Sequence, residues 1–174
     1  RSLIQFRNSS QRILLATDLA ARGIDIPGLD YIIHYEMPQR EEEFTHRNGR
    51  TARMNLNGAA FCIKGKNDKI PEYARKIKTS KISEGASIPK NKWKTIYISG
   101  GRRDKISKGD IAGLFIKKGN IDVRDLGVIE LKNDCAFVAV IASKAAHICK
   151  RLNNQRLKKK KVRISMIKYE NLKK

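Results

Sequence analysis

The feature that most constrains the fold is an ordered series of six segments in the second half of the chain. Two of them, residues 107–118 and 143–152, carry apolar side chains at helical spacing, and Ser107 and Ser143 can cap them. The other four are short, apolar and typical of strands: residues 94–99, 127–131, 135–141 and 161–166. The order β-α-β-β-α-β predicts a four-stranded antiparallel sheet with two helices on one face.

Two aromatic residues fall on the strands expected at the centre of this sheet. Because side chains alternate along a strand, Tyr97 points away from Ile96 and Ile98, and Phe137 also points away from its chain neighbours. If the β-branched residues face the helices, Tyr97 and Phe137 lie side by side on the opposite face. An RRM-like fold binds RNA on that face, and a base stacked on such a ring contributes ~1–3 kcal/mol. The alternative is that both rings only cover the sheet, because Cys135 stands where the RRM signature has another aromatic residue.

The positive charge is concentrated in the same half of the chain. The net charge is +21: residues 1–80 carry 14 basic and 9 acidic side chains, and residues 81–174 carry 24 and 8. Such a balance favours nucleic acid as the partner. A run of lysines is often only solvated surface. The run at residues 158–161, however, lies against a predicted strand, so we favour RNA contact for it. The candidate phosphate contacts are Arg102, Arg103, Lys105, Lys108, Lys158, Lys159, Lys160, Lys161 and Arg163.

The domain organisation follows from composition. Residues 81–93 contain Gly, Pro and Ser without periodicity and predict a linker between residues 1–80 and an RRM-like domain at 94–168, with a tail at 169–174. In the first domain, alternating strands and helices favour a parallel sheet covered on both sides. The expected elements are strands at 12–16, 31–36 and 58–63 and helices at 41–53 and 67–78.

Three arginines lie near the end of the helix expected at residues 41–53, in the sequence His46-Arg47-Asn48-Gly49-Arg50-Thr51-Ala52-Arg53. Spacings of three residues place Arg47, Arg50 and Arg53 on one helix face. Guanidinium groups so close together repel one another unless an anion lies among them, and their planar fork matches phosphate oxygens. A polyphosphate is the expected partner, and a solvated basic face is the alternative.

A second motif lies upstream, Ala16-Thr17-Asp18-Leu19-Ala20-Ala21-Arg22-Gly23-Ile24-Asp25-Ile26. Together the two stretches resemble motifs V and VI of the DEAD-box RNA helicases in order, spacing and charge. Asn48 stands where that family usually has an apolar residue and Ala52 where it often has Gly; neither change removes a charge. The resemblance implies part of the second RecA-like domain of a helicase.

The resemblance also implies a nucleotide site. ATP would lie between two RecA-like domains, and Arg50 and Arg53 would reach its γ-phosphate. Arg53 would be the arginine finger that stabilises the phosphoryl-transfer transition state. Asp25 would accept hydrogen bonds from the ribose.

Further roles follow from the same resemblance. Thr17, Arg22 and Gly23 would contact the RNA sugar-phosphate backbone, which carries no sequence information. His46 and Arg47 would couple the ATP and RNA sides through interdomain contacts, although a structural role for His46 stays open.

The C-terminal half is similar to the RNA-binding domain of the DbpA/YxiN branch of the DEAD-box helicases. Two stretches carry this similarity, Gly100-Gly101-Arg102-Arg103-Asp104-Lys105 and Lys108-Gly109-Asp110-Ile111-Ala112-Gly113. It implies a monomeric enzyme that binds a 23S rRNA hairpin, acts on pre-50S particles in large-subunit assembly and unwinds short duplexes when ATP and RNA close its two domains.

Several sequence features limit this interpretation. No GxxxxGK[ST] loop and no Asp-Glu-Ala-Asp occur, although a helicase needs both to hold phosphates and Mg²⁺. We therefore expect the C-terminal portion of a longer ATP-dependent helicase, inactive alone, with its Mg²⁺ ligands elsewhere and no metal site of its own. Cys62, Cys135 and Cys149 are expected as buried thiols in a reducing compartment. No signal peptide or membrane span is evident, which favours the cytoplasm.

Two other functions remain possible from sequence. One is a non-catalytic RNA-binding adapter with a vestigial RecA-like scaffold, which a degenerate arginine motif would favour; Arg47, Arg50 and Arg53 are all in place. The other is a DNA translocase with the same core, which the RRM-like tail disfavours.

Overall fold

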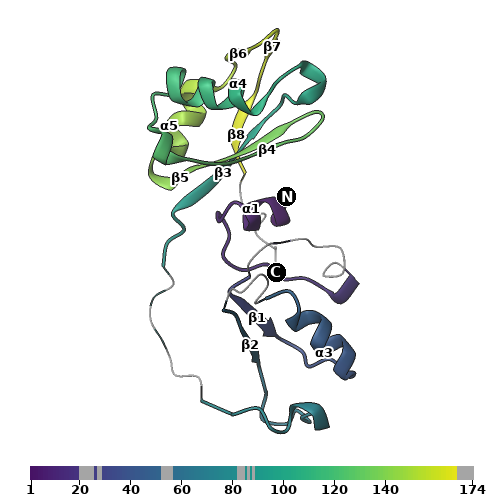
Figure 1. Ribbon diagram of the computed structural model, residues 1–174. Helices are drawn as coiled ribbons and strands as arrows, with labels where there is room; N and C mark the ends of the chain where they lie inside the picture. The colour runs from purple at the N-terminus through teal and green to yellow at the C-terminus, as the bar shows by residue number, and fades with distance from the viewer. Residues whose placement is uncertain are drawn as a thin grey trace. The chain divides into compact units, whose positions relative to one another are not determined.

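The structure is a computed structural model of the 174-residue chain. It describes residues 1–19, 26, 29–51, 57–81, 85, 87 and 89–167. The chain divides into two compact units (Figure 1), a larger one formed by Arg1–Leu14 with Ile88–Lys174 and a smaller one formed by Leu15–Ser87.

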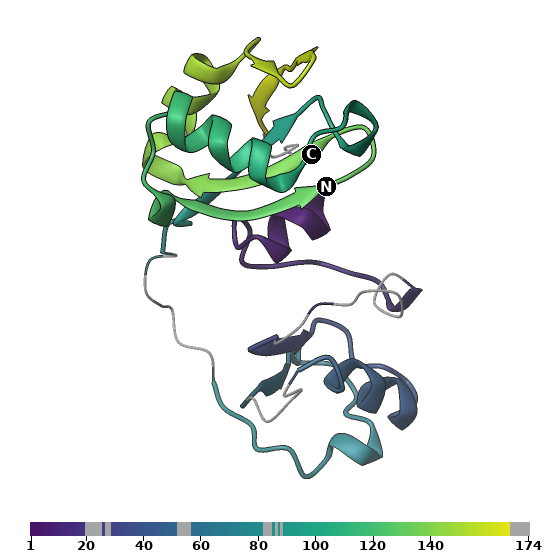
Figure 2. The same cartoon turned by 45° about the horizontal axis from the view of Figure 1, so that its top comes forward.

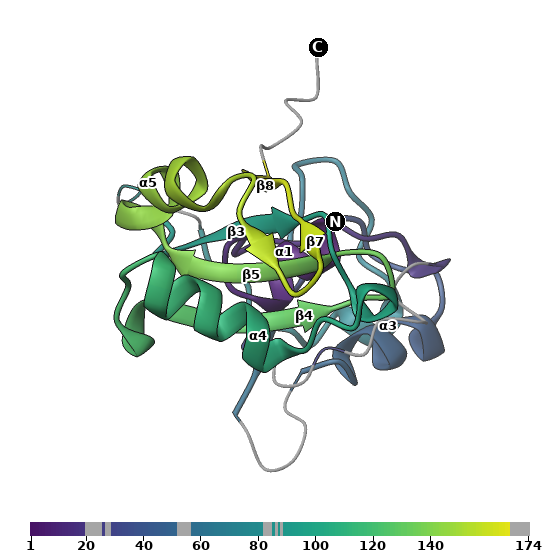
Figure 3. The same cartoon turned by 90° about the horizontal axis from the view of Figure 1, so that it is seen from above.

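The larger unit is built on a four-stranded antiparallel sheet with strand order β4-β5-β3-β8. The strands are β3 (Trp93–Ile98), β4 (Leu126–Leu131), β5 (Ala136–Ile141) and β8 (Ile164–Met166). Helices α4 (Lys108–Gly113), extended by the π-helical turn η3 (Leu114–Lys118), and α5 (Ala142–Leu152) cover one face (Figure 3). The predicted RRM-like order of elements is confirmed.

The core of this unit lies between the sheet and the two helices. Ile96 and Ile98 on β3 face the helices, as do Val138 and Val140 on β5, and all four are fully buried. Phe115 fills the centre of the core from the helical layer. The β-branched residues therefore face the helices, as their alternation predicts.

The helix caps are as predicted for one helix and not for the other. The hydroxyl of Ser107 accepts a hydrogen bond from the Asp110 N–H at 3.1 Å and completes a capping box. The prediction that Ser143 caps the second helix is wrong, because β5 runs directly into α5 and Ile141 occupies the cap position.

Helix α1 (Ser2–Arg7) lies on the opposite face of the same sheet (Figure 2). The turn after it is polar and buried: the Asn8 side-chain amide donates to the hydroxyl of Thr95 on β3 at 2.8 Å, and the Ser10 hydroxyl also bonds Thr95. The Asn91 amide donates to the Ser10 carbonyl at 2.9 Å. Residues 1–14 thus contact the RRM-like fold, whereas the sequence placed them in the first domain.

The smaller unit contains a parallel pair of strands, β1 (Tyr31–His34) and β2 (Ala59–Cys62), in the register Tyr31↔Ala59 to His34↔Cys62. Helix α3 (Glu41–Asn48) follows β1, and its first turn carries three glutamates that suit a helix N-terminus. The parallel pairing is that of an α/β fold, as predicted.

Three predicted elements of the smaller unit and its surroundings differ. Residues 12–16 form no strand, and Ile13 and Leu15 are 79% and 86% exposed, because no strand of the described chain pairs with them. The helix expected at residues 67–78 is a single turn, η1 (Glu72–Ala74), because Pro71 lacks an N–H and disfavours a helical residue before it. Helix α3 ends at Asn48, before Gly49, and not at residue 53.

Within the described residues, no helix combines the length and apolar character that a membrane crossing requires.

Candidate nucleic-acid interface and helicase motifs

The loop after β3 is held by the turn between β4 and β5. The backbone N–H groups of Arg102 and Arg103 donate to the carbonyls of Lys132 and Asn133, each at 3.0 Å. A Cβ at Gly101 would lie 2.3 Å from the Asn133 carbonyl oxygen, so only glycine fits. This close approach of Gly101 to the backbone of the β4–β5 turn fixes the loop that carries the cations.

A hairpin that the sequence did not predict presents the lysine run. Strands β6 (Arg156–Leu157) and β7 (Lys160–Lys161) pair with Leu157 opposite Lys160, which leaves Lys158 and Lys159 as a two-residue turn. The strand predicted at residues 161–166 is therefore two strands, β7 and β8 (Ile164–Met166), separated by Val162 and Arg163.

Two ion pairs join this hairpin to the loop after β3 and to α4, and a third contact is made by Arg163, which follows the hairpin. The Lys160 ammonium lies 2.9 Å from Oδ2 of Asp104, in the turn η2 (Arg102–Asp104), and the Lys158 ammonium lies 2.9 Å from Oδ1 of Asp110. The Arg163 N–H donates to the Ser99 hydroxyl at 2.8 Å. The two basic groups that the sequence indicated separately thus form one surface, here called the basic cluster. Its members are Arg102, Arg103, Lys105, Lys108, Lys158, Lys159, Lys160, Lys161 and Arg163.

Most cations of the basic cluster are available to a ligand. Within the described part of the chain, six of them have no side-chain partner and are exposed to solvent: Arg102, Lys105, Lys108, Lys159, Lys161 and Arg163. Arg103 pairs with Asp134 at 2.9 Å, but both side chains are largely exposed, so the pair is weak. The arrangement can neutralise several phosphates, and charge of this kind supplies most non-specific affinity for nucleic acid.

The two aspartates at the cluster keep their negative charge. A hydrogen bond from the Lys160 ammonium, and one from the Gly101 N–H, hold the pKa of Asp104 below its ordinary value. The Ser107 hydroxyl and the Lys158 ammonium lower the pKa of Asp110 to about 2. The sequence did not predict a role for Asp104 or Asp110, because the lysines with which they pair, Lys160 and Lys158, are distant along the chain.

The rings of Tyr97 and Phe137 are adjacent on the sheet face opposite the helices, but only Tyr97 is accessible to solvent to a useful extent. Tyr97 and Phe137 are paired across β3 and β5, with ring centroids 5.7 Å apart in an edge-on contact. Phe137 is only 7% exposed, whereas Tyr97 is half-buried. On the same face, Asn8 and Ser10 bury Thr95. Base stacking on the two rings stays a prediction, and Phe137 offers little surface for it in this arrangement.

In the smaller unit, an ion pair joins described residues of the two helicase-like motifs. Arg47 on α3 donates from Nε and Nη2 to the carboxylate of Asp18 at 2.6 and 2.7 Å, and from Nη1 to the Glu36 carbonyl at 2.9 Å. The carboxylate hydrogen bonds raise the pKa of Arg47. The predicted interdomain role of Arg47 stays a prediction, and Asp18, inside the first motif, was missed as its partner.

Beside this pair lies a buried histidine. His34 on β1 is 1% exposed, stacks on Phe44 of α3, and its Nε2 lies 2.8 Å from Oδ1 of Asn48. Its Nδ1 has no hydrogen-bond partner among the described residues, and burial lowers the pKa of this imidazole. The contact between Asn48 and His34 thus joins the end of α3, where Arg47 lies, to strand β1.

The remaining candidate residues fall into two groups. Thr17 and His46 are exposed, and Arg50 is half-buried just beyond α3, with no side-chain partner in the described part of the chain. This free cation suits a phosphate ligand. Arg22, Gly23, Asp25 and Arg53 lie outside the described residues, so the assembly of an ATP site stays a prediction.

No group of three His, Cys, Asp or Glu side chains among the described residues could hold a metal ion. The cysteine thiols are half-buried, and burial raises the pKa of Cys149 to about 11.

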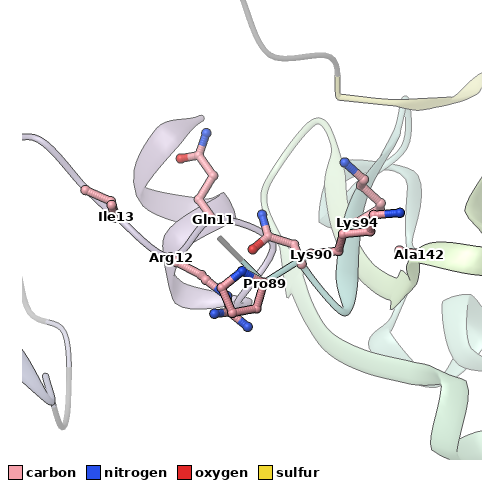
Figure 4. A pocket seen from close by; sticks show the side chains of 8 residues that line it. Gln11, Arg12, Ile13, Pro89, Lys90, Lys94 and Ala142 are labelled. Carbon is pink, nitrogen blue, oxygen red and sulfur yellow. The ribbon is translucent and has the colours of Figure 1, made fainter. Parts of the chain in front are cut away.

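A shallow pocket of the larger unit adds to its basic surface (Figure 4). It is lined by Arg12, Lys90 and Lys94, together with Gln11 and Pro89. Among the described residues, no acidic side chain lines the pocket, so it adds only positive charge to the surface of the larger unit.

Comparison with known proteins yields two family matches. Residues 95–166 match the DbpA RNA binding domain, and residues 1–55 match the helicase conserved C-terminal domain. The chain is 32% identical to the ATP-dependent RNA helicase DbpA of Escherichia coli (strain K12) over 97% of its length, and 27% identical to that of Bacillus subtilis (strain 168) over 92%. It spans 38% and 40% of these relatives. Over 65 residues the chain is also 51% identical to the mitochondrial DEAD-box ATP-dependent RNA helicase 9 of Arabidopsis thaliana, which covers 37% of this chain and 11% of that protein.

Proposed function

We propose that the chain works as the C-terminal portion of a DbpA-type ATP-dependent RNA helicase, because residues 1–55 match the helicase conserved C-terminal domain and residues 95–166 match the DbpA RNA binding domain. In this proposal the enzyme unwinds short RNA duplexes in the cytoplasm. The RNA-binding domain tethers it to a 23S rRNA hairpin on pre-50S particles.

The basic cluster supports the RNA part of this proposal. Four of its free cations project from a loop and a hairpin that are fixed to one another by Lys160 and Asp104. Phosphate contacts from such a surface position an RNA, while recognition of a hairpin requires its shape or its unpaired bases. A bound hairpin would raise the local concentration of nearby duplexes for the helicase core.

The arginine motif supports the helicase part. The ion pair between Arg47 and Asp18 ties the motif that would touch RNA to the motif that would touch nucleotide. Arg50, whose side chain is free among the described residues, would bind a phosphate, and we assign Arg53 the transition-state role. ATP would supply the phosphoryl group that is transferred to water, with Mg²⁺ held by residues of another RecA-like domain.

The observation that carries the proposal is the match of residues 95–166 to the DbpA RNA binding domain, the part of the chain that also holds the basic cluster. The test is a titration of the chain with a 23S rRNA hairpin and with a scrambled hairpin of equal length, at low and at higher salt. We expect a preference for the authentic hairpin that survives higher salt. Equal affinities that fall together with salt would overturn the rRNA assignment.

The catalytic part is tested in a helicase that contains this chain together with both RecA-like domains. Arg53→Ala should lower ATP turnover by about 10³ or more, the range of an arginine finger, and leave hairpin binding unchanged. Arg40→Ala, which removes an exposed arginine before α3, is the matched control. Turnover near the wild-type rate in Arg53→Ala would contradict the arginine-finger assignment, whereas no ATP turnover in the wild type would favour a non-catalytic adapter.

A further inference from the structure

Two carboxylates occupy a surface whose charge should attract a polyanion. Asp104 lies within the loop that carries Arg102, Arg103 and Lys105, and Asp110 lies in the first turn of α4 beside Lys108. Each carboxylate lowers the positive charge that draws RNA. Because these carboxylates weaken the attraction for RNA, we expect their contacts to make another contribution to the interface.

Each carboxylate joins a backbone turn to one lysine of the hairpin. Oδ2 of Asp104 accepts the Gly101 N–H at 3.0 Å and the Lys160 ammonium at 2.9 Å. Oδ2 of Asp110 accepts the Ser107 N–H at 2.9 Å, while its Oδ1 holds the Lys158 ammonium at 2.9 Å. Both aspartates thus hold two segments together that are about fifty residues apart in sequence.

The backbone of the hairpin supports this interpretation. Lys158 opens the two-residue turn with a φ of 54°, in the left-handed region that glycine and asparagine favour. A lysine there costs conformational energy that a glycine would not. Glycine would fit this turn without strain but has no side chain, whereas the side chain of Lys158 reaches Asp110.

We propose that Asp104 and Asp110 are positioning residues of the RNA interface, which hold the hairpin β6–β7 against the loop and α4 so that Lys159 and Lys161 meet RNA phosphates in a fixed geometry. This inference rests on the proposed RNA-binding function. It assigns the two carboxylates no contact with RNA; they act through Lys160 and Lys158.

The decisive variant is Asp104→Asn. Its amide oxygen still accepts the Gly101 N–H, but the charge that holds Lys160 is gone. Charge counting alone predicts tighter RNA binding, because a negative charge is removed. Positioning predicts the opposite sign: about two- to fivefold weaker binding of the 23S rRNA hairpin, the range for one exposed ion pair, and a smaller preference over the scrambled hairpin.

The matched control is Asp122→Asn. Asp122 also accepts a backbone N–H, from Arg124 at 2.9 Å, and pairs with a basic side chain, that of Arg124, but it makes no contact with the hairpin β6–β7. It should bind the hairpin RNA as tightly as wild type or slightly more tightly. The single tryptophan, Trp93 on β3, reports by its fluorescence whether each variant is folded.

A double-variant cycle separates positioning from a turn-stabilising role. If Asp104 acts through Lys160, Asp104→Asn should cause no further loss of affinity in the Lys160→Gln background; Asp104→Glu should restore most of it. A loss that persists in that background, or tighter binding by Asp104→Asn, would overturn the inference. Asp110→Asn with Lys158→Gln repeats the test independently.

The two proposals fail in different ways. If the wild-type chain does not prefer the 23S rRNA hairpin to the scrambled one, the proposed function fails and this inference fails with it. If the wild-type chain shows the preference and Asp104→Asn binds more tightly, only the positioning inference fails.

Discussion

The two units of this chain bury their apolar residues to very different extents. In the larger unit, the core between the sheet, α4, η3 and α5 contains fully buried side chains such as Phe115 and Ile148. In the smaller unit, Tyr31, Ile33 and Phe61 on the paired strands are more than half exposed, while the polar His34 is buried. The difference shows that an apolar pattern becomes a core only where a second layer covers it.

The same contrast separates the two candidate sites. The basic cluster is fixed by contacts within the larger unit, between the loop, the hairpin and α4. Among the described residues, the ion pair between Arg47 and Asp18 joins the helicase motifs, and both side chains keep some exposure. We therefore expect RNA binding to depend on residues 89–167, and catalysis to depend on surroundings that the smaller unit does not provide by itself.

The largest effect should distinguish the two cores. Phe115→Ala removes a fully buried ring and should lower the free energy of unfolding of the larger unit by about 3–5 kcal/mol. Phe61→Ala removes a ring that is 54% exposed and should change stability by about 0.5 kcal/mol or less. Chemical denaturation followed by Trp93 fluorescence measures the first, and amide hydrogen exchange of β1 and β2 the second. Losses of equal size would mean that the smaller unit has a comparable core.

The next effect concerns the loop that carries the basic cluster. Gly101→Ala places a Cβ against the Asn133 carbonyl and should destabilise the larger unit by about 1–3 kcal/mol. Gly113→Ala is the matched control, because a Cβ there meets nothing within 4 Å and alanine favours the helix. Thermal melts should separate the two variants in sign. A neutral Gly101→Ala would show that the loop shifts freely.

The third prediction concerns the smaller unit at mildly acidic pH. Burial lowers the folded-state pKa of His34 below 6.5, so the unfolded chain takes up a proton at higher pH than the folded chain. The smaller unit should therefore lose stability as the pH falls below 6.5, and His34→Gln should remove that dependence. Hydrogen exchange of β1 at several pH values measures it. His46→Gln, at an exposed site, is the control and should keep the wild-type profile.

The smallest effect is expected in the larger unit at strongly acidic pH. The pKa of Asp110 is lowered to about 2, so its stabilising contribution is present above pH 3.8 and is lost as the pH falls toward 2. Asp110→Asn should flatten the stability profile in that range alone. Denaturation between pH 2 and 5 checks this, and an unchanged profile would show that the Ser107 and Lys158 contacts do not hold this carboxylate.

The sequence predicted best where partners lie close or follow a simple period. The alternation of Ile96, Tyr97 and Ile98 placed two residues in the core and one on the other face. The predicted strand at 12–16 is wrong because an apolar pattern does not show whether a partner strand is present. The predicted helix at 67–78 is wrong because Pro71 interrupts it. The contacts of Asp18, Asp104 and Asp110 link distant segments, and no pattern in a single sequence reveals such pairs.

The most direct test asks whether the basic cluster, and not the net charge, binds RNA. Arg102→Gln, Arg103→Gln and Lys105→Gln together remove three charges from the loop; Lys117→Gln, Lys118→Gln and Lys150→Gln remove three exposed charges from the helices. The measurement is the salt dependence of affinity for the 23S rRNA hairpin. We predict a slope that is flatter by up to roughly 2–3 for the loop variant and unchanged for the helix variant. Equal losses in both variants would contradict it, because RNA would then be held by charge alone.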